Sequence, residues 1–436
     1  MKRSHVLAVV IMAAFLATSS PAQDLEGILV EAREAMSAGN YDTARQKLEQ
    51  ILQQNNTYAP AYFELSKVVL IQDDLKGAQE NIAAAIENDP RNEEYRAQAE
   101  TIAELSSIMS DAKRTYDERD YLGAVSRYEK ALENHPTFAS AYYGMGMAFA
   151  QAGQLREAAE SFRQAQQHNP NEESYASALR KIVVDQYNEG NRFYRSRDWE
   201  SAAEAYQMAI DLDSSFHQAY YRLARVNRLM GDNEAALETL DRVLVVKPDY
   251  LNAYVEKGAI LKREDRLAEA EASYRQAITV DPRSDDAWVG LGSILRQGRA
   301  SEAITAFQTA IEINRKNGDA AEYLGEIFSE QENWPEARKY LESAVKIKSD
   351  DHVTAWRLAH VYNEIGEYEL ARRQAKRSTD LKKTFEYGWY EKGIAEKALG
   401  NRVAAIEAFR NAEKGRDASI RRTAQYELKQ LESPNR

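Results

Sequence analysis

The chain contains no cysteine among its 436 residues. This excludes a disulfide framework, a thiolate metal site and a lipid-modified cysteine. Proline and glycine are also scarce, at 9 and 20 residues, which is typical of a largely helical chain. Cationic residues are the minority, with 57 Lys and Arg against 69 Asp and Glu. Nucleic acid is therefore not an expected partner, because displacing phosphate counterions requires a cationic surface.

Long apolar runs are missing, with one short exception near the start. Residues 6–17 are apolar, follow Lys2 and Arg3, and precede small residues that end at Ala22. This pattern predicts a signal peptide over residues 1–22, and hence a periplasmic or secreted protein with no integral membrane span after cleavage. An uncleaved anchor is the alternative, although the run is short for a bilayer. A cysteine-free exported chain also avoids mispairing in an oxidising compartment.

Motifs of catalysis are missing as well. The chain has no HExxH, GxSxG, phosphate-binding glycine loop or EF-hand loop. His135, His168 and His217 occupy near-equivalent corner positions, which favours turn roles, and His352 and His360 are too far apart on one predicted helix to share a metal. The sequence therefore predicts no catalytic residue, no metal site, no cofactor and no enzyme activity.

One phrase recurs along most of the chain. "AEASYRQAITVDP", from residue 270, has an alanine, an aromatic residue four positions later, a second alanine and a proline. Most of its copies are 34 residues apart, and a second phrase such as "AYVEKGAIL" (253–261) precedes each copy. The leading alanines are Ala44, Ala78, Ala124, Ala158, Ala202, Ala236, Ala270, Ala303, Ala337, Ala371 and Ala405.

Each copy predicts two helices joined by a short turn. Glycine or alanine within the first helix (Gly258, Gly292) permits close approach of the second helix, whose aromatic residue fills the space between units. Glycine at the turn ends the first helix, and proline ends the second. One such hairpin cannot bury its apolar faces alone, so the copies are expected to stack into a solenoid.

This pattern resembles the tetratricopeptide repeat, W-x2-L-G-x2-Y followed by A-x3-F and P. "WVGLGSIL" with "AITAF" in residues 288–307 is a close match. The resemblance implies an all-α fold, a right-handed α-solenoid of about eleven helix-turn-helix units. The tenth copy, "ARRQAKRSTDLKK", departs from the pattern, because Ala375 takes the aromatic position and Ser378 the second alanine position.

Two long steps between copies divide the predicted array. Residues 91–104 and 171–182 each follow a proline and read as extensions of the next first helix. The predicted sections are units 1–2 (25–92), an extended helix with units 3–4 (93–172), an extended helix with units 5–11 (173–419), and a capping helix with a tail (420–436).

In the family that the sequence resembles, the first helices line a concave groove that binds partner segments. The aromatic position of these helices is expected either to anchor a partner or to pack between neighbouring first helices. Its occupants are Phe63, Tyr143, Tyr187, Tyr221, Trp356 and Tyr390.

A basic set is expected on the same face. Arg228, Lys262 and Arg296 share one position in three successive units, and four further polar residues lie near them in the predicted array: Asn191, Arg195, Arg222 and Arg225. This pattern predicts a positive stripe that receives an acidic segment or a C-terminal carboxylate. The alternative is that these cations favour the helix C-terminus and that Glu256 pairs with Arg225. The Lys/Asn/Asn/Lys/Arg carboxylate clamp of some family members is not found here.

The leading hypothesis is a non-enzymatic protein-interaction scaffold or adaptor of the bacterial cell envelope. Self-association is an alternative of the same class. Binding of a glycan or small ligand through the aromatic residues is another, and a cell-wall-acting enzyme subunit would require a convergent acid–base cluster in the groove.

Overall fold

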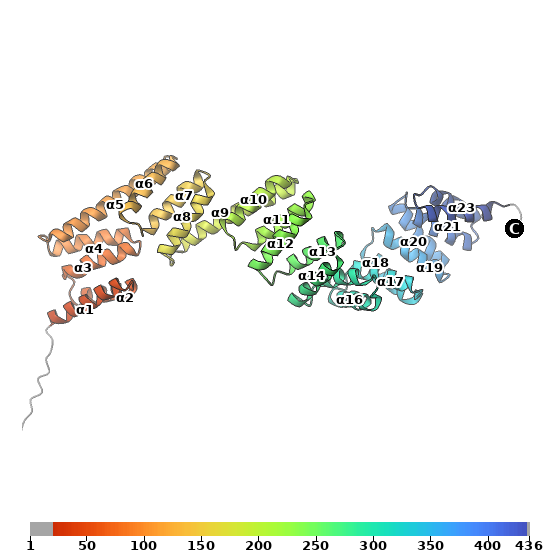
Figure 1. The fold of residues 1–436 in the computed structure, drawn as a ribbon, viewed down its shortest axis with the longest axis horizontal. Helices are drawn as coiled ribbons and strands as arrows, with labels where there is room; N and C mark the ends of the chain where they lie inside the picture. The colour runs from red at the N-terminus through yellow and green to blue at the C-terminus, as the bar shows by residue number, and fades with distance from the viewer. Residues whose placement is uncertain (1–20, 434–436) are drawn as a thin grey trace, which may run out of the picture. The chain divides into compact units, whose positions relative to one another are not determined.

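A computed structural model describes residues 21–433. The predicted signal peptide lies outside these residues except for its last two positions. Within the described part, the chain forms 23 α-helices and no strand. This confirms an all-α solenoid of helix-turn-helix units (Figure 1). Its handedness stays a prediction.

Contacts between helices divide the chain into two units, with the boundary between Phe216 and His217. This boundary lies inside the predicted section 173–419. In the first unit the helices follow one another as α1 (Pro21–Ser37), α2 (Tyr41–Gln54), α3 (Ala59–Ile71), α4 (Leu75–Asn88), α5 (Glu93–Asp117), α6 (Tyr121–Asn134), α7 (Ala139–Gln151), α8 (Leu155–His168), α9 (Glu173–Ser196) and α10 (Trp199–Leu212).

The second unit contains six further pairs and a last single helix. They are α11 (His217–Met230), α12 (Asn233–Val246), α13 (Leu251–Arg263), α14 (Leu267–Val280), α15 (Asp285–Leu295), α16 (Ala300–Ile313), α17 (Gly318–Glu330), α18 (Trp334–Ile347), α19 (His352–Glu364), α20 (Tyr368–Leu381), α21 (Glu386–Ala398), α22 (Arg402–Glu413) and α23 (Ala418–Glu432). Odd-numbered helices up to α21 are the first helices of their pairs.

The turn inside each pair uses a left-handed residue. Gly153 has φ +80° after α7, as the sequence predicts, because glycine adopts this conformation without a steric penalty. Asp73 and Asp265 take the same conformation at φ +72° and +57°. An aspartate often opens the next helix, as where Asp232 accepts a hydrogen bond from the Ala235 N–H at 3.0 Å.

Within a pair, glycine and an aromatic ring interlock. A Cβ atom at Gly292 would lie only 2.8 Å from the Phe307 ring, and Phe307 is fully buried. The leading alanines Ala270 and Ala303 are fully buried as well. These positions therefore set the distance between the two helices of a pair, which makes one repeat the packing unit of the fold.

The two extended first helices, α5 and α9, reach back over the preceding pair. Tyr95 of α5 packs against Phe63 with ring centroids 4.7 Å apart, and Tyr175 of α9 packs against Tyr143 at 5.0 Å. Phe63 and Tyr143 belong to the aromatic position expected to face a partner. In this unit the extended helices cover them instead.

The turn residue Asp73 ties α4 to both α7 and α9. Its carboxylate accepts hydrogen bonds from the backbone N–H and the hydroxyl of Ser140, each at 2.8 Å, and from the hydroxyl of Tyr175. Burial, with the hydrogen bond to Asp73, raises the pKa of Tyr175. One acidic side chain thus joins three repeats of the first unit.

Candidate functional site

The first helices of neighbouring pairs contact one another. For example, α13 contacts α15, and α19 contacts α21. We call the surface that they form the first-helix face. Its polar side chains are joined from one repeat to the next by ion pairs and hydrogen bonds, which we call the first-helix ladder. The ladder comprises Arg33–Glu64 in the first unit, and Arg228–Glu256, Lys262–Ser293, Arg296–Glu326, Arg357–Glu326, Arg357–Glu322, His360–Glu391 and Lys397–Glu427 in the second.

The strongest part of the ladder centres on Glu326. Its two oxygens accept from the Arg296 guanidinium at 2.9 and 3.3 Å, and Arg357 lies 3.1 Å away on the other side. Arg357 and Lys348 also pair with Glu322, which is buried. Removing one partner of such a partly buried pair lowers the stability of the fold much more than removing one partner of an exposed pair does.

Three of the predicted basic residues lie within this ladder. Arg228 donates to Glu256 at 2.7 Å, and Glu256 is the carboxylate that the sequence offered as a partner of Arg225. Arg296 is bound by Glu326, whereas Lys262, among the residues that the structure describes, donates only to the neutral Ser293 hydroxyl, at 2.8 Å. Burial and the nearby Arg296 lower the pKa of Lys262.

The remaining members of the basic set are divided between the two units. Asn191 in the first unit accepts a hydrogen bond from Tyr206 at 2.9 Å, and Arg195 is exposed. Arg222 and Arg225 in the second unit both have interaction partners within the protein. In the second unit Arg228 and Arg296 are therefore paired with carboxylates of the protein itself, and the positive stripe stays a prediction.

Three of the remaining aromatic candidates pack against neighbouring rings and are half-buried. Tyr187 lies 5.3 Å from Phe216, Tyr221 lies 5.5 Å from Tyr250, and Tyr390 lies 5.8 Å from Phe409, all as centroid separations. The partner rings lie at turns (Phe216 and Tyr250) and on the second helix α22 (Phe409), so the choice between packing among first helices and anchoring a partner stays a prediction.

Trp356 differs because it also lines a pocket. Its ring packs against Tyr387 at 4.9 Å and Phe385 at 5.8 Å, with the Arg357 guanidinium 5.7 Å from its centroid. The pocket has a volume of about 310 Å³ and is lined by Glu326, Ser329, Glu330, Trp356, Arg357 and His360. An aromatic residue beside charged groups of both signs suits a ligand with apolar and polar parts.

His360 brings a titratable group to this pocket. Its Nδ1 lies 3.0 Å from an oxygen of the buried Glu391, whose other oxygen accepts from Asn363 at 2.7 Å. The hydrogen bond to Glu391 raises the pKa of His360 above its ordinary value of 6.5. Protonated imidazole is thus favoured at the pocket wall.

Sequence reasoning named Glu256 but missed the other acidic members of the ladder, and it missed the pocket residues other than Trp356. A signal for most of these acids was present, because they follow their cation by slightly less than one repeat, as Glu256 follows Arg228 by 28 residues and Glu326 follows Arg296 by 30. Glu322 is an exception, because it precedes its partner Arg357 by 35 residues. The pocket itself has no such signal, since it depends on side-chain directions.

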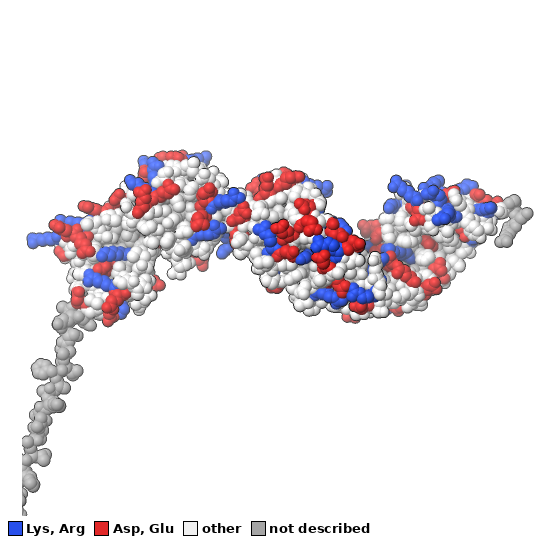
Figure 2. Space-filling view, viewed as in Figure 1, with Lys and Arg blue, Asp and Glu red and all other residues white. Residues whose placement is uncertain are grey.

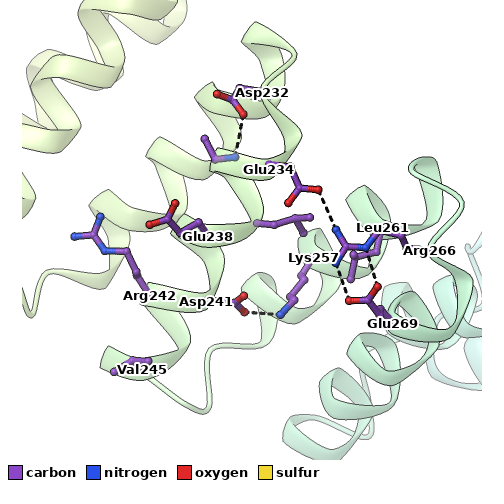
Figure 3. Close-up of a pocket in the computed structure, with 12 residues that line it drawn as sticks. Asp232, Glu234, Glu238, Asp241, Arg242, Val245, Lys257, Leu261, Arg266 and Glu269 are labelled. Atoms are coloured by element: carbon purple, nitrogen blue, oxygen red, sulfur yellow. Dashed lines mark hydrogen bonds and ion pairs between the residues drawn. The ribbon is translucent and has the colours of Figure 1, made fainter.

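A second pocket, of about 630 Å³, lies between α12, α13 and α14 (Figure 3). Its polar groups mostly bond to one another: Arg266 donates to Glu269 at 2.7 Å and to Glu234 at 3.1 Å, and Lys257 pairs with Asp241. The groups that line this pocket therefore hold α12 against the following pair.

Two properties of residues 21–433 bear on ligands and membranes. No group of three or more His, Asp or Glu side chains there is placed to hold a metal ion. None of the helices in this range is both long and apolar enough to cross a bilayer.

Two family models match the chain. The model described as tetratricopeptide repeat matches residues 35–100 and 116–182. The model described as cilia and flagella-associated protein 70 C-terminal domain matches residues 185–406.

Similar proteins include DnaJ homolog subfamily C member 3 of Rattus norvegicus, 25% identical over 209 residues, which are 44% of this chain and 41% of the relative. The chain thus spans about two-fifths of that relative's length. TPR repeat-containing protein MJ1428 of Methanocaldococcus jannaschii is 22% identical, over 91% of this chain and 71% of the relative.

Among solved structures, YrrB, a TPR protein with an unusual peptide-binding site, is 21% identical with a TM-score of 0.39, over 44% of this chain and 99% of that one. The pilF protein of Pseudomonas aeruginosa is 16% identical with a TM-score of 0.44, over 48% and 96%.

Proposed function

Because the chain belongs to the tetratricopeptide repeat family, we propose that it is a non-enzymatic scaffold of the bacterial cell envelope whose first-helix face binds a segment of a partner protein. Repeat proteins of this family are typically protein-interaction scaffolds. The envelope location rests on the predicted signal peptide, and the face rests on the geometry of the second unit.

The observation that carries the proposal is the pocket at Trp356. It opens on the first-helix face, and Trp356 and Glu330 contribute an aromatic surface and an exposed carboxylate to it. Aromatic anchors of this kind dominate the binding energy of interfaces, because they bury a large area at low entropy cost. A partner side chain in this pocket would fix the position of the segment along α17 and α19.

Lys262 gives the segment a second contact. Unlike the ladder cations that carry a carboxylate partner, it bonds to a neutral hydroxyl, so an acidic side chain or a C-terminal carboxylate can pair with it without displacing an anion. Such a pair would supply charge complementarity three repeats from the Trp356 pocket.

Site-specific photocrosslinking tests the proposal in envelope extracts. A benzophenone amino acid replaces Ser329, which lines the pocket, or Ser301, which is exposed on the second helix α16. We expect one protein to crosslink through Ser329 and not through Ser301, and mass spectrometry identifies the crosslinked segment. Equal labelling from both positions, or none from Ser329, would contradict binding at this face.

Charge reversal tests the acidic contact separately. Lys262→Glu should weaken binding of the crosslinked segment about tenfold or more, since it places like charges together. Arg263→Glu is the matched control, because Arg263 is the next residue on α13 and is exposed. An equal loss in both variants would show that only net charge matters.

The same pocket supports a second candidate, a small ligand such as a glycan stacked on Trp356. Glycans stack on aromatic faces and bond to charged side chains of the kind found here. Glycan-array binding that is lost in Trp356→Ala, with no crosslinked protein at Ser329, would favour this function over segment binding.

A further inference from the structure

Helix α20 carries a cationic surface in an acidic chain. Residues 369–383 contain six Lys and Arg and only two acidic residues, whereas the whole chain has a net charge of −12. Figure 2 shows Lys and Arg side chains gathered over the C-terminal helices from α20 onward. This segment is the tenth copy of the repeat, which departs from the pattern of the others.

Packing does not require these cations. The helix buries only small side chains: Ala371, Ala375, Ser378 and Thr379. Ala375 and Ser378 are the two residues that replace the usual aromatic and alanine, and both are fully buried. The helix therefore contributes little apolar volume to the core and directs its long side chains to the surface.

Some of the cations are held by local partners and others are not. Arg372 pairs with Glu369 at 2.5 Å, and Lys376 pairs with Asp380 at 2.6 Å. Arg373 and Lys383 are exposed and make no ion pair within residues 21–433, and Lys382 lies 5.5 Å from the centroid of Phe385. The surface thus keeps a positive excess after its internal pairs are counted.

An apolar side chain lies among these cations. Leu381 is 43% exposed and immediately precedes Lys382 and Lys383 at the end of the helix. Exposed apolar residues flanked by lysines are typical of surfaces that contact lipid headgroups, where the apolar group enters the interface and the cations pair with phosphates.

We propose that this surface, the α20 basic face (Arg373, Lys376, Arg377, Leu381, Lys382 and Lys383), binds a membrane surface of anionic phospholipids. A helix of 14 residues is about 21 Å long, more than twice the Debye length of about 8 Å at physiological salt. Charges that lie farther away than this length are largely screened, so the acidic residues of distant repeats contribute little to the field at this face.

The face is independent of the first-helix face, because α20 is a second helix and none of its residues takes part in the first-helix ladder. Membrane attachment through α20 would leave the proposed segment-binding surface available. An acidic protein is a different occupant of the same cations, but it would give no role to the exposed Leu381.

Co-sedimentation of the full chain with vesicles tests the proposal. We expect binding to vesicles of phosphatidylglycerol mixed with phosphatidylcholine, no binding to pure phosphatidylcholine, and release by molar salt. Arg373→Gln, Lys382→Gln and Lys383→Gln together should weaken partitioning roughly a hundredfold, since each cation near an anionic surface contributes about a fivefold factor.

A second triple variant with the same net charge as the first provides the control. Arg263→Gln, Arg315→Gln and Lys316→Gln neutralise three exposed cations elsewhere in the second unit and should leave vesicle binding unchanged. Absence of binding by the wild type, or an equal loss in both triple variants, would overturn the proposal. Binding to polyglutamate in preference to the anionic vesicles would overturn it in favour of an acidic protein partner.

Discussion

At the scale of single residues, the fold depends on close contacts between glycine and an aromatic ring. Gly146 of α7 faces Phe162 of α8, which is 1% exposed, and a Cβ atom at Gly146 would lie 2.7 Å from that ring. The ring is held inside the pair and cannot move away without opening the packing. This contact recurs at Gly292 with Phe307 and at Gly393 with Phe409.

We expect Gly146→Ala to destabilise the first unit by about 1–3 kcal/mol, because overpacking a filled core forces neighbours from their positions. Gly27→Ala is the control: Gly27 lies in α1 with no atom near its Cβ position, so alanine should stabilise that helix by about 0.5–1 kcal/mol. Denaturant unfolding followed by circular dichroism measures both. Equal and small effects would contradict the interlocking role of Gly146.

His360 should make the stability of the second unit depend on pH. Glu391 raises its pKa in the folded state above 6.5, so the folded state binds this proton more tightly than the unfolded chain. The resulting stabilisation is fully present below pH 6.5 and is lost as the pH rises through the folded pKa.

The test compares the free energy of unfolding of the wild type with that of His360→Gln across this pH range. The free energy of unfolding of the wild type should exceed that of His360→Gln at low pH, and this difference should shrink as the pH increases. A difference that stays constant with pH would show that Glu391 does not retain the proton on His360.

At the scale of elements, the extended helices α5 and α9 bind the first unit together beyond nearest neighbours. Their first turns cover Phe63 and Tyr143, and Asp73 joins the α3–α4 turn to Tyr175 of α9, 102 residues away. Most contacts of a solenoid are between adjacent repeats. The hydrogen bond between Asp73 and Tyr175 joins repeats that are not adjacent, so it should make unfolding of the first unit more cooperative.

We expect Asp73→Asn and Tyr175→Phe each to cost about 1–3 kcal/mol, because each weakens a hydrogen bond to a charged and partly buried group. In the double variant the costs should not add, with a coupling of about 0.5–3 kcal/mol. A double-mutant cycle by denaturant unfolding measures this. Additive costs would mean that the two side chains act independently.

Sequence reasoning was most successful where one residue type has one geometric use. Gly292 and Ala303 marked the approach of two helices because only a small residue fits there. Residues 91–104 and 171–182 fall in the regions of α5 and α9 because their apolar spacing continues into the next helix.

The binding site was harder to predict. The cationic position at Arg228 and Arg296 was visible, but pairing with Glu256 and Glu326 depends on how repeats are placed side by side.

At the scale of the whole chain, the two units should fold separately. The first unit has its own apolar core from Leu25 to Ala148, and the second ends in a core formed by Phe409, Ala424 and Leu428 under α23. Because most stabilising contacts of a solenoid lie between adjacent repeats, each unit holds several such interfaces of its own on either side of the division between α10 and α11.

Fragments 21–216 and 217–436, expressed separately, should each be helical and unfold cooperatively. Their summed circular dichroism spectra should reproduce the spectrum of the joined chain. A fragment that is unfolded alone and folds only when the other is added would contradict this division.

The first-helix ladder also bears on mechanics. Each of its bonds crosses a junction between repeats, so any bending of the second unit changes the length of several ion pairs at once. The side chains of Glu256 and Glu326 in these pairs are only 17% and 18% exposed. Salt screens such partly buried charges only weakly. The unit should therefore be a stiff spring, and its stiffness should change little between physiological buffer and molar salt.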